Sequence, residues 1–113
     1  MRGLTVRWSL AEAPGEALDE LRDYVEDVSH GRFSALAGLS FKTWRARPGE
    51  WFEGTYVFAD AAARAEFESG FSAGAADSPV SKILGRAPSL IEPCEVVAVA
   101  EGAAGFEPSS RLD

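Results

Sequence analysis

Cysteine and histidine are almost absent from this sequence, whose 113 residues include one of each, Cys94 and His30. A single cysteine excludes an internal disulfide framework, and one histidine among scattered carboxylates does not make a metal-ligand set. The glycines do not form a phosphate-binding loop, because Gly70 and Gly74 do not stand between a strand and a helix. We therefore expect no metal and no flavin, nicotinamide or other cofactor.

Basic residues and long apolar runs are also scarce. The chain has 11 Lys and Arg against 18 Asp and Glu, which gives a net charge of −7. A nucleic-acid-binding face needs clustered basic side chains, so we expect no nucleic-acid partner. No apolar stretch approaches the ~20 residues that span a bilayer, and no signal region precedes the first strand-like pattern. We therefore expect no membrane partner and a cytoplasmic location.

Aromatic residues, by contrast, are abundant, with three Trp, seven Phe and two Tyr. In a chain of this size they fill a core, line a pocket or build an interface. The length suits one domain. We expect that domain to span residues 1–102, and we expect residues 103–113, which are small, polar or proline-containing, to form a flexible tail.

Hydrophobic periodicity predicts the order strand, helix, strand, strand, helix, strand. The expected strands are 4–9, one that begins at 39, 51–58 and 90–100, and the expected helices are 14–28, 61–71 and 79–84. Gly31 is expected to stop the first helix, and Asp60 to cap the second. This order predicts an α+β domain of the ferredoxin-like βαββαβ type, with a four-stranded antiparallel sheet and its helices on one face.

The second and third expected strands are joined by a turn at 47–50, which contains Pro48 and Gly49. The cross-strand pairs that follow are Thr43–Gly54, Phe41–Tyr56, Leu39–Phe58 and Trp44–Glu53. This register assigns to the helix-facing side Leu39, Phe41, Arg45, Phe52, Tyr56 and Phe58. It assigns to the open side Lys42, Trp44, Glu53, Thr55 and Val57. An open face that mixes polar and aromatic residues favours a partner sheet, so we expect a homodimer.

Three segments carry a family resemblance: the run 38–44 (Gly-Leu-Ser-Phe-Lys-Thr-Trp), the run 53–58 (Glu-Gly-Thr-Tyr-Val-Phe), and Asp60 with the Ala-rich helix after it. They resemble the small mono-oxygenases of the dimeric α/β-barrel superfamily, which also contains the antibiotic-biosynthesis mono-oxygenases. The likeness extends over roughly residues 4 to 100. It implies a homodimer whose two sheets close into a barrel, with a pocket between sheet and helices in each subunit.

The resemblance also implies cofactor-independent mono-oxygenation of an aromatic or polyketide-like substrate. The superfamily includes isomerases and cyclase-like proteins, so a cyclase, isomerase or dehydratase, or a non-catalytic small-molecule-binding dimer, stays open as an alternative.

Tyr56 is the first candidate catalytic residue, because its hydroxyl would hold a substrate carbonyl or phenol; the alternative is a core tyrosine. Gly54 would leave a gap for a planar ligand or ease a bulge. Trp8 would line the pocket or fill the core, and Trp44 would contact substrate or anchor the dimer. Two phenylalanines complete the expected substrate-binding set, Phe41 and Phe67.

His30 and Arg45 are the other candidate catalytic residues. His30 is a possible base near neutral pH, although a histidine at a helix end also serves as a cap. Arg45 would stabilise an enolate or phenolate oxygen, unless it is simply exposed. For Lys42 an ion pair with Glu53 is the favoured role, and a catalytic amine is the lesser alternative.

Overall fold

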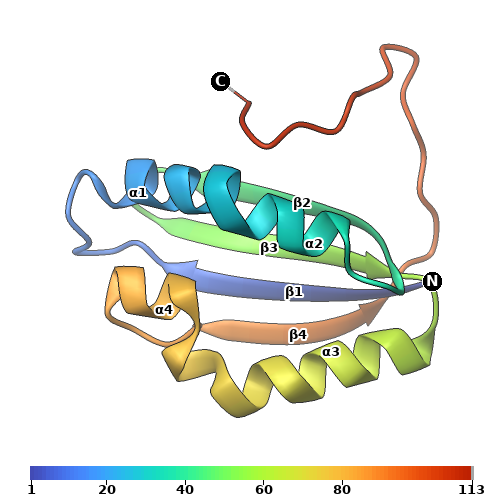
Figure 1. Ribbon diagram of the computed structural model, residues 1–113, viewed down its shortest axis with the longest axis horizontal. Helices are drawn as coiled ribbons and strands as arrows, with labels where there is room; N and C mark the ends of the chain where they lie inside the picture. Colours follow the sequence, from blue (N-terminus) through green and yellow to red (C-terminus); the bar gives the residue numbers. More distant parts are fainter. Residues whose placement is uncertain (113) are drawn as a thin grey trace.

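Four antiparallel strands form one sheet in the computed structural model, which describes residues 1–112 (Figure 1). The strands are β1 (Arg2–Ser9), β2 (Leu39–Arg47), β3 (Trp51–Phe58) and β4 (Leu90–Glu95), in the spatial order β2-β3-β1-β4. The helices are α1 (Ala17–Tyr24), α2 (His30–Ser34), α3 (Ala61–Gly74) and α4 (Pro79–Leu84). They cover one face of the sheet. The predicted α+β class and antiparallel sheet are confirmed, and the arrangement is compatible with a ferredoxin-like fold.

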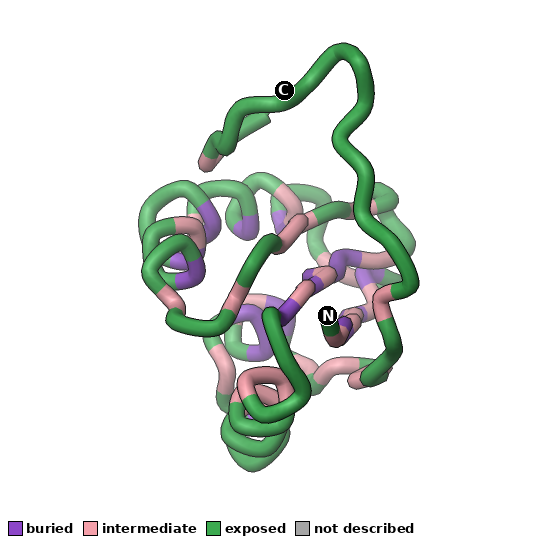
Figure 2. The backbone as a smooth tube through the Cα atoms, turned by 90° about the vertical axis from the view of Figure 1, so that its right-hand side faces the viewer, coloured by how far each residue is buried: buried purple, intermediate pink, exposed green. Residues whose placement is uncertain are grey.

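The core lies between the sheet and the helices, where Figure 2 shows the buried positions gathered. Leu4, Val6 and Trp8 alternate along β1 and are all buried, as the period-two pattern predicts. The indole Nε1 of Trp8 donates to Ser81 Oγ at 3.0 Å, and that hydroxyl donates to the Ala75 carbonyl at 2.6 Å. The core therefore satisfies the polar atom of its largest side chain through the turn between α3 and α4.

The first helix continues through Gly31, so the prediction that this glycine ends it was wrong. A π-helical segment, Val25–Ser29, joins α1 to α2, and Gly31 lies inside α2. The wider π turn keeps Ser29 and Phe33 on the buried side, where both are almost fully enclosed. Burial of Phe33 outweighs the roughly 1 kcal/mol cost of a glycine in a helix.

The register of β2 against β3 differs from the predicted one by a single residue. Leu39 does pair with Phe58, but a bulge follows, and the later pairs are Phe41–Val57, Lys42–Tyr56, Trp44–Gly54 and Arg45–Glu53. The turn is shorter than expected, because Arg47 already pairs with Trp51. Gly49 adopts φ +76° and Glu50 N–H donates to the Arg47 carbonyl, as in a type II turn with Pro48 at its second position. The bulge at the far end absorbs the displaced residue.

This shift exchanges the two faces of β2. Lys42 and Trp44 face the helices, contrary to the predicted open side. Phe41 and Arg45 lie on the open face, contrary to the predicted helix-facing side. One finding on that face explains the preference: Glu53 is fully buried between the guanidinium groups of Arg7 and Arg45. The observed register therefore places Arg45 beside Arg7 at this buried carboxylate, whereas the predicted register put Arg45 on the opposite face.

Beyond β4 the chain contains no helix or strand through residue 112, although a strand to residue 100 was expected. This segment runs back past α1, where the Arg111 guanidinium contacts Asp23 at 3.0 Å and Glu26 at 2.8 Å (Figure 1). The division into a domain and a flexible tail stays a prediction. Over residues 1–112, no helix combines the length and the apolar character needed to cross a membrane.

Candidate functional site

An inner cavity of about 210 Å³ lies between the sheet and the helices. Its sheet side is formed by Trp8, Lys42, Trp44, Phe52, Gly54 and Tyr56. Residues of the π segment, α2, α3 and α4 close it on the helix side. We call this space the inner cavity. An apolar cavity of roughly 150 Å³ accommodates benzene, so the inner cavity has room for one substituted ring.

The amine of Lys42 and the hydroxyl of Tyr56 meet in this cavity. Lys42 Nζ donates to Tyr56 Oη at 3.1 Å. The same nitrogen lies 3.3 Å from the ring centroid of Phe33, 4.2 Å from that of Tyr56 and 4.4 Å from that of Trp44. Lys42 as a residue is only half-buried, as befits an edge strand, but its polar end is enclosed by aromatic rings.

Burial, with a smaller contribution from the nearby Arg32 guanidinium, holds the pKa of Lys42 well below its ordinary value of 10.5. The ring faces favour the ammonium form. However, no carboxylate among residues 1–112 forms a salt bridge with Nζ, so nothing replaces the lost hydration of the charge. Burial also raises the pKa of Tyr56, which keeps its hydroxyl protonated. The pair therefore combines an amine that loses its proton readily with a neutral hydrogen-bond donor.

Gly54 lets the side chains of this pair pack directly against the backbone of β3. A Cβ at this position would lie 3.1 Å from Tyr56 Cε1 and 3.2 Å from both Tyr56 Oη and Lys42 Cε. These distances are tighter than ordinary contacts, so a side chain here would displace the amine or the phenol ring. Glycine opposite Trp44 therefore allows the amine and the phenol ring to occupy the positions in which they meet.

The aromatic walls of the cavity are held by hydrogen bonds and by other rings. Trp44 Nε1 donates to Ser29 Oγ at 3.2 Å, which ties β2 to the π segment. Phe33 packs edge-on against both Trp44 and Tyr56, with centroid separations of 6.1 and 5.6 Å. Phe67 packs behind Tyr56, with a centroid separation of 5.0 Å. These contacts fix the positions of the rings before any ligand binds.

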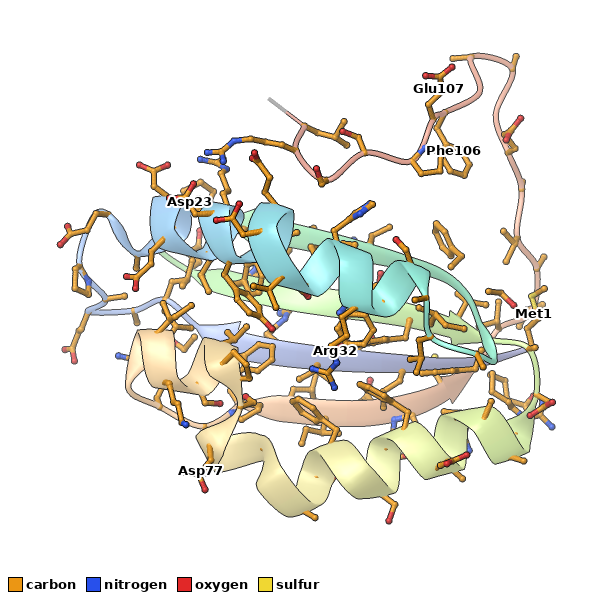
Figure 3. All side chains as sticks on the ribbon, in the orientation of Figure 1. Met1, Asp23, Arg32, Asp77, Phe106 and Glu107 are labelled. Atoms are coloured by element: carbon orange, nitrogen blue, oxygen red, sulfur yellow. The ribbon has the colours of Figure 1, made fainter. Side chains whose placement is uncertain are left out.

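An outer groove of about 610 Å³ adjoins the inner cavity between β2, the first helix and the C-terminal segment. Both spaces share the lining residues Phe33, Lys42, Trp44 and Phe52. The tail closes the groove on its far side with Phe106, which Figure 3 shows standing away from the sheet. Lys42 therefore lies at the junction of a smaller and a larger space.

The predicted site residues divide into two groups. Tyr56, Trp8, Gly54 and Trp44 come together around the inner cavity, and Phe67 supports Tyr56 from behind. Phe41 does not join them: it is 38 % exposed on the open face. Their roles in binding or catalysis remain predictions.

The other two candidate catalytic residues lie outside the inner cavity. Arg45 faces the open side, where its guanidinium binds Glu53. His30 lines the outer groove, with its ring centroid 5.7 Å from that of Trp44. His30 begins α2 inside a continuous helix, so it does not cap a helix end either. The sequence analysis misplaced both residues because two of its predictions were wrong, namely the register of β2 and the end of the first helix.

Lys42 is the residue that the sequence argument undervalued. The predicted register put it on the open face beside Glu53, where an ion pair was the natural expectation. The Pro48-Gly49 pair marks the turn, but it does not by itself decide whether Ala46 or Arg47 pairs with Trp51. Arg47 pairs with Trp51 in the structure, so Lys42 lies opposite Tyr56.

Comparison with known proteins gives a structural neighbour and no function. No family model matches the chain, and no curated protein matches it. A solved structure from Nitrosomonas europaea, described as NE2512 protein of unknown function, is similar with a TM-score of 0.64 and 26% sequence identity. The match covers 90% of this chain and 94% of that one. Because the function of that protein is unknown, the similarity bears on the fold alone.

Proposed function

We propose that the inner cavity is the active site of a cofactor-independent mono-oxygenase that acts on a small aromatic substrate. The observation that carries this proposal is the contact between the Lys42 amine and the Tyr56 hydroxyl inside an aromatic cavity. Proton removal by Lys42 rests on that contact and on the lowered pKa of the amine. The choice of dioxygen as the second reactant rests on the resemblance of the strands to small mono-oxygenases.

In the proposed reaction, the neutral amine of Lys42 accepts a proton from a phenol or enol of the substrate. The resulting ammonium is stabilised by the ring faces of Phe33 and Trp44 and by the substrate anion beside it. Tyr56 Oη accepts a hydrogen bond from Lys42, which leaves its own proton free to donate to the substrate oxygen. The electron-rich anion then reacts with dioxygen, and one oxygen atom enters the ring while the other leaves as water.

The volumes of the inner cavity and the outer groove restrict the size of the substrate. One substituted ring fills a cavity of about 210 Å³, whereas a polycyclic, polyketide-like compound exceeds it. A larger substrate would place its reacting ring in the inner cavity and the remainder in the outer groove of about 610 Å³. Lys42, at the junction of the two spaces, would reach the reacting ring in either case.

We further propose that the chain acts as a homodimer that pairs through the open sheet face. Phe41 is exposed there, and the neighbouring Arg7 stacks on Trp51 at 4.3 Å from its ring centroid. Because Glu53 neutralises part of the charge of Arg7 and Arg45, a second sheet could cover the face without burying an unpaired carboxylate. Light scattering coupled to size-exclusion chromatography measures the molar mass in solution and so tests the homodimer. A strictly monomeric protein would refute it.

Oxygen uptake tests the enzymatic proposal. Hydroquinone is a suitable one-ring probe, because its mono-oxygenation to hydroxybenzoquinone and water consumes one dioxygen per molecule. Metal-free protein should take up oxygen at neutral pH faster than a protein-free blank. Lys42→Met should lower the rate by about 100-fold or more, the usual contribution of a general base, and Lys82→Met, on the exposed face of α4, should leave it unchanged.

The same assay separates the alternatives. Conversion of the probe under strictly anaerobic conditions would favour a cyclase, isomerase or dehydratase. Quenching of tryptophan fluorescence by hydroquinone without any product would favour a binding protein, since Trp8 and Trp44 line the cavity. Uptake that Lys42→Met leaves intact would contradict the proposed base.

A further inference from the structure

We propose that Lys42 is a covalent binding site for single-ring aromatic aldehydes that carry a carboxylate, which it captures as an imine. This activity goes beyond oxygenation. It requires only the inner cavity, its amine and its hydroxyl, and it consumes no oxygen.

The first requirement is an accessible amine that is not held in an ion pair. Among residues 1–112, Lys42 Nζ has one polar partner, the neutral hydroxyl of Tyr56, and it faces aromatic rings elsewhere. Burial without a carboxylate partner favours the unprotonated amine, which is the nucleophile. The chain contains one other lysine, Lys82, which is exposed on α4 in contact with water. The two lysines therefore form a built-in comparison within one molecule.

The second requirement is room for the carbonyl group. The inner cavity of about 210 Å³ supplies this room, because both Lys42 and Tyr56 line it. A carbonyl group in the cavity can receive the amine at its carbon and a hydrogen bond from Tyr56 at its oxygen. The rings of Phe33 and Trp44, which line the cavity beside Nζ, would then contact the aromatic part of the aldehyde.

The chemistry balances without an external oxidant or reductant. The nitrogen lone pair attacks the carbonyl carbon, and the carbonyl oxygen takes a proton as the amine loses one, which gives a carbinolamine. Tyr56 can pass this proton, because its hydroxyl both accepts from Nζ and donates onward. Loss of the hydroxyl group as water then leaves the carbon–nitrogen double bond. One amine and one aldehyde thus give one imine and one water.

Arg32 recognises the carboxylate, which is the second substituent on the aromatic ring of the aldehyde. This residue lines the inner cavity but is itself exposed, so it lies at the cavity mouth. Figure 3 shows it between α2 and the segment formed by α3 and α4. Within residues 1–112 its guanidinium forms no salt bridge. An arginine that is free to bind a carboxylate in a bidentate manner favours an anionic group on the ring, pointing outward.

Reductive trapping tests the proposal. The full chain is incubated anaerobically near neutral pH with 4-formylbenzoate, reduced with cyanoborohydride, digested, and analysed by peptide mass spectrometry. We expect the Lys42 peptide to carry at least about tenfold more benzylic adduct than the Lys82 peptide, because each unit by which an amine pKa is lowered raises its unprotonated fraction about tenfold. Equal labelling of the two lysines, or more on Lys82, would overturn the covalent site, and this comparison needs no variant.

The methyl ester of the same aldehyde tests the carboxylate preference, since it has similar carbonyl reactivity but no charge. Lys42 should be labelled several-fold faster by the acid than by the ester, and Arg32→Gln should abolish this difference while Lys42 is still labelled. Equal rates for acid and ester in the unaltered chain would refute the role of Arg32. Because oxygen is absent, failure of trapping is distinct from failure of oxygen uptake: either can occur without the other.

Discussion

The lowered pKa of Lys42 should give the stability of this protein an unusual pH dependence. Below that pKa, both the folded and the unfolded chain carry the proton, and the folded state bears the cost of a buried ammonium. Between that pKa and 10.5, the unfolded chain still binds the proton and the folded chain does not. The free energy of unfolding therefore rises with pH across this window, by up to about 1.4 kcal/mol per pH unit for one proton.

Substitution Lys42→Met removes the proton and keeps the length of the side chain. At neutral pH the variant should be at least as stable as the parent, because folding of the parent must either remove the proton from the amine or bury an ammonium, and the variant avoids both costs. The difference between the two should shrink as the pH rises towards 9.5. Measurements should stop there, because the raised pKa of Tyr56 makes the folded state lose stability as the pH rises beyond 10.

Urea denaturation followed by tryptophan fluorescence, at half-unit steps from pH 7 to 9.5, measures this slope. Lys82→Met is the matched control and should follow the pH dependence of the parent, because Lys82 is exposed. If the parent and Lys42→Met differ by a constant free energy across the whole range, the amine keeps its proton inside the aromatic cage. The proposed base and the proposed imine would then both lose their support.

Two further predictions concern the neighbouring residues. Glu53→Gln should lower the free energy of unfolding, measured by urea titration, by about 1–3 kcal/mol, because a fully buried carboxylate loses its charge-assisted bonds to two arginines. The control is Glu50→Gln, whose ion pair is exposed, and it should cost less than about 1 kcal/mol. Gly54→Ala should weaken hydroquinone binding, measured by tryptophan quenching, by about tenfold as its methyl group crowds the cavity. Gly70 lines the same cavity, but a Cβ there would have no contact within 4 Å, so Gly70→Ala should bind hydroquinone normally. Equal weakening in both variants would refute the role of the close contacts at Gly54.

Structural features that depend only on residues adjacent in the sequence were predictable from the sequence. Asp60 caps α3 as expected, with its carboxylate accepting a hydrogen bond from the Ala63 N–H at 2.9 Å. Pro79 starts α4 and Gly85 ends it with φ +69°. Such features follow from the backbone sterics and local hydrogen bonds of a few consecutive residues, which are the same in any fold.

Part of the candidate site was predictable for the same reason. Trp8 and Tyr56 lie on strands whose alternation is plain in the sequence, so their helix-facing orientation was foreseen and is observed. The positions of His30 and Arg45 were not, because each follows a one-residue irregularity. In β2 and in the π segment, one additional residue turns every later side chain through a different angle.

The sequence by itself therefore determined the order of helices and strands, the antiparallel sheet and the aromatic residues that fill the core. Only the tertiary structure decided that Lys42 enters the cavity. A bulge costs little locally, and nothing in the alternation of residues 39–47 marks where it falls. Its position is selected by distant contacts, namely the two arginines that enclose Glu53 on one face and the hydrogen bond from Trp44 to Ser29 on the other. Those contacts exist only after the sheet and the first helix have packed together.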